Sequence, residues 1–117
     1  MTDQAQAGGP IAYADFQKVA IKVGRVVSAT DHPNADKLLV LQVDLGNEKR
    51  QIVAGLRGHY TAAEMVGKNI VVVTNLAPRM MRGQQSNGML LAAVSADQTK
   101  VIVLTTDREV EPGSAVS

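Results

Sequence analysis

The chain has 117 residues, 45% of them hydrophobic, which is enough for one domain with a single core. It contains no cysteine, which excludes disulfides, thiol nucleophiles and cysteine-ligated zinc and fits a reducing cytoplasm. No apolar run approaches the roughly 18 residues that a membrane-spanning helix needs, and none opens the chain as a signal peptide. We therefore expect a cytoplasmic protein with no membrane segment.

The net charge is only +1, but it is unevenly distributed along the chain. Residues 1–48 carry four basic and six acidic side chains, a balance of −2. Residues 49–100 carry seven basic and two acidic side chains, a balance of +5, and residues 101–117 return to −2. This asymmetry favours a basic face that meets a polyanion. The alternative is that the cations, which form no continuous run, are spread over several solvated surfaces.

The chain is expected to begin with a tail and a bent strand. Residues 1–11 are small and polar with glycine and proline, which indicates a flexible tail before a domain over residues 12–117. From Phe16 onward apolar and polar residues alternate, which predicts a half-buried strand with Phe16 in the core. Gly24 interrupts the alternation and predicts a bulge or bend, so that one long strand serves two sides of a barrel.

The rest of the chain alternates short strands with turns. Thr61 and Glu64 form a predicted capping box that opens a short helix ended by Gly67. Alternation and turn residues predict the remaining strands, at 39–45, 49–54, 69–75, 88–95 and 99–104, with turns at 32–36, Gly46-Asn47 and Pro112-Gly113. This order predicts an all-β fold, a five-stranded Greek-key barrel of the OB-fold type with a short helix and a C-terminal β extension. Periodicity alone does not separate it from an SH3-like barrel.

The stretch 75–93, whose loop joins two predicted buried strands, is the most informative part of the chain. It contains Arg79 and Arg82 together with two glycines, a serine and several amide side chains. A cationic, hydrogen-bonding loop on a β scaffold suits phosphate and ribose contacts better than catalysis. Because guanidinium groups offer a bidentate fork, we expect the two arginines to point outward, side by side, as phosphate ligands. The alternative is a pair of solvated loop arginines.

Catalytic patterns are missing from the sequence. Ser86 lacks the first glycine of a nucleophile elbow, and His32 and His59 lie in separate loops without an obvious carboxylate partner. Gly67-Lys68 does not complete a phosphate-binding loop. Two histidines without cysteines make a poor zinc site, and the basic half has few carboxylates for acid–base chemistry. We expect a non-enzymatic protein without metal or cofactor.

Seven short segments, in order along the chain, together resemble a known family. They are DFQKV at 15–19, ADKLL at 35–39, DLG at 44–46, VAGL at 53–56, VGK at 66–68, NLAPR at 75–79 and SNGM at 86–89. In this order they resemble the tRNA-binding domain family, which includes stand-alone dimeric tRNA-binding proteins and the C-terminal domain of bacterial methionyl-tRNA synthetases. The resemblance covers about residues 12–117. It implies an OB-fold homodimer, formed partly by the C-terminal strands, that binds the outer corner of folded tRNA without catalysis, alone or with an aminoacyl-tRNA synthetase.

The resemblance also implies which residues contact RNA: Lys37, Asn75, Arg79, Arg82, Ser86 and Met89. Many relatives have a lysine after the Pro-Arg pair, where this chain has Met80, and its next cation follows two positions later. From the residues alone, each candidate has a structural alternative. The amide and hydroxyl groups could bond the local backbone, the methionine could pack in the core and the lysine could pair with the preceding aspartate.

The small number of aromatic residues favours recognition of RNA by shape. Tyr13, Phe16 and Tyr60 make up 3% of the chain, too few for the stacking platforms of single-strand binders. Contacts to phosphates and 2′-hydroxyls of a folded RNA need donors rather than rings.

Two other functions remain open. One branch of the fold family resembles secretion chaperones of the CsaA type, and Met80, Met81 and Met89 could adapt to unfolded peptides. The NLAPR segment instead resembles the tRNA-binding branch. The third interpretation is a structural dimerisation module that binds neither ligand.

Overall fold

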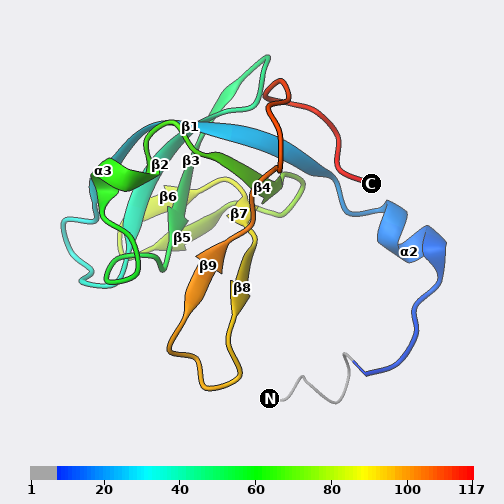
Figure 1. Ribbon diagram of the computed structural model, residues 1–117, viewed down its shortest axis with the longest axis horizontal. Helices are drawn as coiled ribbons and strands as arrows, with labels where there is room; N and C mark the ends of the chain where they lie inside the picture. Colours follow the sequence, from blue (N-terminus) through cyan, green and yellow to red (C-terminus); the bar gives the residue numbers. More distant parts are fainter. Residues whose placement is uncertain (1–7) are drawn as a thin grey trace.

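The computed structural model describes residues 8–117 and has a curved antiparallel sheet at its centre (Figure 1). Its five strands, in the spatial order β3-β2-β1-β4-β7, are β1 (Ile21–Asp31), β2 (Leu39–Asp44), β3 (Lys49–Ala54), β4 (Asn69–Val73) and β7 (Met89–Leu90). The edge strands β3 and β7 contact each other, so the sheet forms a nearly closed barrel. The predicted OB-fold-like architecture is confirmed. The predicted tail at 1–11 lies mostly outside the described residues.

Strand β1 serves two sides of the barrel, as predicted. Its first half pairs with β4 and its second half pairs with β2, and Arg25 takes part in both pairings. The irregularity lies between Val26 and Ser28 rather than at Gly24. Gly24 has a different role, because a Cβ atom there would lie 2.5 Å from Cγ1 of Val43. The glycine therefore lets β1 and β2 approach each other closely.

The core is built by alternating apolar residues of β2 and β3. Leu39, Leu41, Val43 and Ile52 are fully buried, and each contributes about 1.5–3 kcal/mol by leaving water. The predicted short helix is α3 (Ala62–Met65), which places a fully buried methionine over the same core. Its capping box is present: the amide of Glu64 donates to Oγ1 of Thr61 at 3.2 Å, and the amide of Thr61 donates to the Glu64 carboxylate at 2.6 Å.

The expected strand from Phe16 is wrong at its beginning. Residues Tyr13–Gln17 form a short helix, α2, and β1 starts only at Ile21. Phe16 is 43% exposed and Val19 is 41% exposed, so neither belongs to the core. Because α2 buries no residue, it has no hydrophobic stripe by which the sequence could have revealed a helix.

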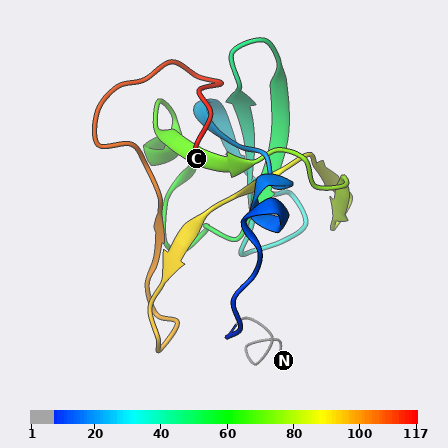
Figure 2. The same cartoon turned by 90° about the vertical axis from the view of Figure 1, so that its right-hand side faces the viewer.

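Two small hairpins project from the barrel on different sides (Figure 2). One consists of β5 (Arg79–Met81) and β6 (Gln84–Ser86), and the other of β8 (Ala92–Val94) and β9 (Val101–Val103). The second hairpin confirms the predicted C-terminal β extension, although the strand expected at 88–95 is divided between β7 and β8. After β9 the chain returns to β1, where the amide of Gly113 donates to the carbonyl of Val23 at 2.7 Å. Neither of the helices described here is long and apolar enough to span a membrane.

Candidate nucleic-acid interface

The β5–β6 hairpin carries both arginines of the predicted site. Its two central turn residues are Arg82, with φ 55°, and Gly83, with φ 92°. Positive φ at both positions matches the twist of the flanking strands, which is why glycine is favoured in such turns. Arg82 adopts this conformation although it has a Cβ atom, and its exposed side chain extends from the tip of the hairpin.

A buried histidine ties this hairpin to the turn between β1 and β2. His32 is only 2% exposed, and its Nε2 lies 2.9 Å from the carbonyl oxygen of Met81. The amide of Asn34 donates to Nδ1 of the same ring at 2.9 Å. A carbonyl oxygen only accepts, so Nε2 carries a proton. Nδ1 accepts from an amide and therefore carries none, so the ring is the neutral Nε2–H tautomer. His32 thereby fixes the residue before Arg82 against the turn that carries Lys37.

Lys37 and Arg82 line one hollow, which we call the basic hollow. Its other walls are the remaining residues of the segment 34–38, and its volume is about 400 Å³. Both basic side chains are exposed, and no ion pair to either is found within residues 8–117. The structure therefore brings together two predicted site residues that are 45 positions apart in the sequence. Asp36 also lines this hollow, so its side chains carry two positive charges and one negative charge, a balance of +1 that suits a phosphate group.

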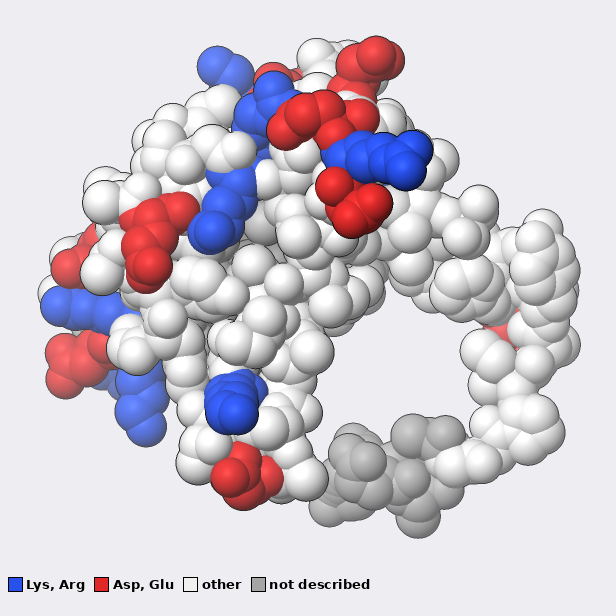
Figure 3. All heavy atoms as spheres, in the orientation of Figure 1, with Lys and Arg blue, Asp and Glu red and all other residues white. Residues whose placement is uncertain are grey.

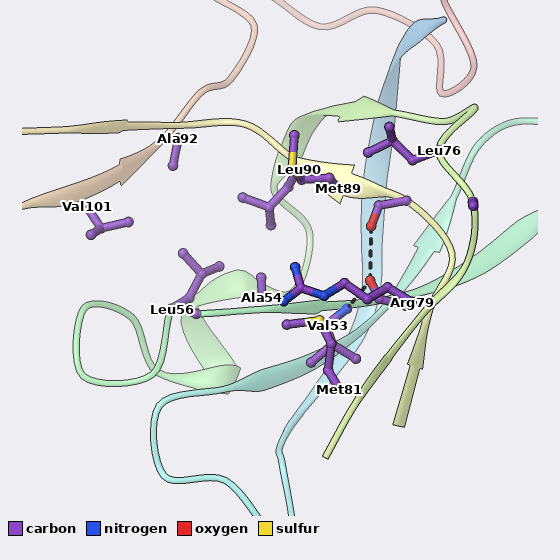
Figure 4. A pocket seen from close by; sticks show the side chains of 14 residues that line it. Val53, Ala54, Leu56, Leu76, Arg79, Met81, Met89, Leu90, Ala92 and Val101 are labelled. Atoms are coloured by element: carbon purple, nitrogen blue, oxygen red, sulfur yellow. Dashed lines mark hydrogen bonds between the residues drawn. The ribbon is translucent and has the colours of Figure 1, made fainter. Parts of the chain in front are cut away.

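Arg79 lines a second, more enclosed cavity, which we call the apolar hollow. It has a volume of about 300 Å³ and lies where the edge strands β3 and β7 meet the two hairpins. Figure 4 shows the Arg79 side chain extending across the hollow, with its guanidinium group on the side formed by Ala54 and Leu56. Met89 lines the same hollow and is 47% exposed. Arg79 and Arg82 thus serve two separate hollows rather than standing side by side.

Two predicted site residues use their polar groups for hydrogen bonds to the backbone of the protein. Asn75 accepts a hydrogen bond from the amide of Ala20 at 2.9 Å and donates to the carbonyl of Lys18 at 2.6 Å. Ser86 is buried, donates to the carbonyl of Gly88 at 2.9 Å and accepts from the amide of Val53 at 2.9 Å. Both residues fasten the ends of the arginine-bearing loop to the barrel.

Most of the other arginines have acidic partners. Arg25 contacts Glu109 at 2.6 Å, Arg57 contacts Asp31 at 3.3 Å, and Arg50 contacts Glu48 at 3.0 Å. The hydrogen bond from Arg50 lowers the pKa of the Glu48 carboxyl. Figure 3 shows basic and acidic side chains interspersed over one face of the molecule, without a patch of a single sign on that face. Whether a given arginine can bind an anion therefore depends on its own ion pair rather than on the net charge of the surrounding stretch of sequence.

The histidines do not form a catalytic or metal site in the part of the chain that the structure describes. Both ring nitrogens of His32 are used in hydrogen bonds, and His59 is exposed. Within residues 8–117, no three side chains of metal-ligating type gather in one place.

Sequence reasoning missed both His32 as a support and the apolar hollow. The hollow is lined from β3, β5, β6, β7, β8 and β9, so its walls become neighbours only in the folded chain. The position of His32 before a turn-forming Pro-Asn pair was visible, but its partner Met81 lies 49 residues away.

The described residues form a nearly closed OB-fold-like barrel and display basic side chains that have no ion pair among those residues. These features define a class of small β domains suited to binding oligomeric ligands. Residues 21–115 match the family model described as "Putative tRNA binding domain". The chain belongs to this tRNA-binding domain family.

Sequence and structural relatives agree with this assignment. The chain is 51% identical over 107 residues to a methionine–tRNA ligase of Thermotoga maritima, covering 92% of this chain but 17% of the ligase. It thus spans only a small part of the curated relatives that it matches.

Solved structures of similar size match nearly the whole chain. The crystal structure of a MetRS related protein from Pyrococcus horikoshii superposes with a TM-score of 0.88 at 36% identity, covering 93% of this chain and 99% of the other. The CsaA chaperone protein of Picrophilus torridus superposes with a TM-score of 0.83 at 29% identity, covering 92% of this chain and 100% of the other.

Proposed function

We propose that the protein binds folded tRNA at its outer corner, in the cytoplasm and without catalysis. The observation that carries this proposal is the placement of Lys37, Arg79 and Arg82 on two hollows beside one hairpin, with no acidic partner within residues 8–117. Membership of the tRNA-binding domain family supplies the ligand class. Lys37 and Arg82 contact phosphates, Arg79 and Met89 contact the RNA from the apolar hollow, and Asn75 and Ser86 hold the loop in shape.

The test is the salt dependence of tRNA binding. Each phosphate contact releases counterions, so the affinity falls linearly with salt on logarithmic axes. We expect Lys37→Ala and Arg82→Ala each to reduce the magnitude of this slope by about 1. Arg82→Ala and Arg79→Ala should each weaken different tRNA species equally. Arg108→Ala is the matched control, because Arg108 is exposed, pairs with Asp107 at 3.7 Å and lines neither hollow. A flat salt titration of the unaltered protein would contradict tRNA binding.

We also propose that the protein acts as a homodimer, alone or as an appendage of a methionyl-tRNA synthetase. Large apolar side chains are exposed on the β8–β9 hairpin and the following residue, with Val94 at 56%, Ile102 at 53% and Leu104 at 41%. Exposed large apolar side chains grouped on one hairpin favour an interface. Light scattering should give a dimer for the unaltered protein and a monomer for Ile102→Glu. Val27→Glu, at a 41% exposed site on β1, is the control that should remain dimeric.

Binding of unfolded peptides is the second candidate function. It is favoured by the exposed Met80, at 67%, by Met89 at 47%, and by the likeness to a protein named as a CsaA chaperone. Gel shifts with folded tRNA and with an unfolded polypeptide, run side by side, separate the two functions. A structural dimerisation module would bind neither.

A further inference from the structure

The apolar hollow has a composition that phosphate binding does not explain. Its walls include Leu56, Leu90 and Val101, and Ser86, one of its polar residues, has its hydroxyl engaged by the backbone. The side-chain cation of the hollow is the guanidinium of Arg79. A free phosphate would gain this single cation but would lose its hydration against aliphatic walls. The ligand that fits must therefore combine an apolar body with a group that a guanidinium recognises.

The conformation of Arg79 further restricts the class of ligand that fits the apolar hollow. Its side chain crosses the hollow while it remains exposed to solvent, and no acidic group pairs with it within residues 8–117 (Figure 4). A guanidinium is planar, weakly hydrated and able to stack on flat π systems while donating hydrogen bonds at its edge. Unstacked RNA bases are held in this manner, between apolar side chains and an arginine plane.

We infer that the apolar hollow is a subsite for one unpaired nucleobase of the bound RNA, stacked on the guanidinium of Arg79 between Leu56 and Leu90. The inference rests on the proposed tRNA binding and adds a base contact to recognition by shape. It also supplies stacking in a chain whose three aromatic residues, Tyr13, Phe16 and Tyr60, do not line the hollow. The RNA backbone that leaves the hollow continues toward Lys37 and Arg82 in the basic hollow.

An aliphatic peptide side chain fits the same hollow less well. It would remove water from the Arg79 guanidinium without offering an acceptor, and an unpaired charge is costly to desolvate. A nucleobase offers both a π face and ring or carbonyl acceptors, so it compensates the cation as it enters. The combination of a π face and hydrogen-bond acceptors therefore favours a nucleobase over an aliphatic side chain.

Two alanines provide a matched pair of variants. Ala92 lines the hollow, whereas Ala63 is exposed on α3 and lines neither hollow. Ala92→Phe fills the hollow without changing any charge. Ala63→Phe adds the same side chain outside the hollow. Thermal unfolding of both variants shows whether the barrel is intact.

The first experiment titrates the unaltered protein with AMP, GMP, CMP and UMP, and separately with inorganic phosphate, while amide NMR signals are recorded. We expect at least one nucleotide to shift the amides of Ala54, Leu56, Met89 and Ala92, and inorganic phosphate to leave them in place. The absence of any shift with all four nucleotides would overturn the inference. So would a shift by an uncharged apolar pentapeptide in the absence of a nucleotide effect, since that result assigns the hollow to peptides. This titration needs no variant.

The second experiment measures tRNA affinity and its salt slope. We expect Ala92→Phe to weaken tRNA binding about tenfold, in line with the loss of one stacked base, with an unchanged slope. Ala63→Phe should bind as the unaltered protein. If tRNA binds with a steep slope but Ala92→Phe has no effect, the base subsite is wrong and the proposed function stands. If the unaltered protein does not bind tRNA, the proposed function itself fails. Should Ala92→Phe unfold, Ala92→Leu takes its place with the same expectations.

Discussion

His32 offers the sharpest test of how the fold positions the proposed site. Replacing it by alanine removes the hydrogen bond to the carbonyl of Met81 and the one from the amide of Asn34. Each is worth about 0.5–1.5 kcal/mol net, so His32→Ala should lower the free energy of unfolding by about 1–3 kcal/mol. Urea denaturation followed by circular dichroism measures this change. His59→Ala is the matched control, because His59 is exposed and should change the stability by less than about 0.5 kcal/mol.

In His32→Ala, the loss of stability should be accompanied by a displacement of the β5–β6 hairpin. Without the ring, the residue before Arg82 is no longer held against the turn that carries Lys37, so the two cations lose their fixed separation. We expect His32→Ala to weaken tRNA binding several-fold and to speed amide exchange at Arg82 and Gly83. The control variant His59→Ala should change neither tRNA binding nor the amide exchange at these two residues.

A double-mutant cycle separates positioning from a general loss of stability. If His32 acts through Arg82, the effect of His32→Ala on tRNA affinity should shrink when Arg82→Ala is already present, with a coupling energy above about 0.5 kcal/mol. Additive effects of the two substitutions on affinity would refute the proposed link. Equal exchange rates at the hairpin tip in the variant and the unaltered protein would refute it as well.

Two further predictions concern parts of the chain outside the site. Hydrogen bonds from Ser95 and Thr99 lower the pKa of Asp97 to about 2, so its stabilising effect is present above the ordinary value of 3.8 and is lost as the pH falls through about 2. Carbon NMR of the carboxyl group measures this, and titration near 3.8 would contradict it. Gly113→Ala should destabilise by about 1–3 kcal/mol in urea denaturation, because φ is +92° and a Cβ would clash with the carbonyl of Leu45. Gly58→Ala, with φ +98° and open space, isolates the backbone strain and should cost less.

The sequence predicted those elements whose signals are local. Strand β3 occupies Lys49–Ala54 as expected, because the turn at Gly46-Asn47 and the alternating apolar residues of the preceding strand both act within a few residues. The capping box at Thr61 is another local signal, and it too was confirmed. Helix α2 was not predicted because it buries none of its residues and so has no periodic apolar pattern.

The site could be predicted only as a set of residue types. Arg79 and Arg82 were identified as exposed loop cations, and both are exposed. Their separation into two hollows follows from contacts over long sequence distances, such as the one between His32 and Met81. Asn75 illustrates the same limit, because its predicted local alternative was an Asx-turn. Its actual partners are the backbone of Lys18 and Ala20, more than 50 residues away, and no local pattern encodes them.

The hydrogen bonds of the loop have a consequence for affinity. Asn75 and Ser86 fasten its two ends and His32 fastens the β5–β6 hairpin, so the backbone that presents the arginines is ordered before any ligand arrives. Ordering a loop on binding costs free energy, about 1–2 kcal/mol for each residue whose backbone becomes fixed. A loop that is ordered in advance avoids most of this cost, and only the long side chains of Arg79 and Arg82 remain to be immobilised. The polar residues of the segment thus divide between two tasks. The amide, hydroxyl and imidazole groups hold the backbone, and the guanidinium groups, which form no ion pair within residues 8–117, are the ones that we propose to contact RNA.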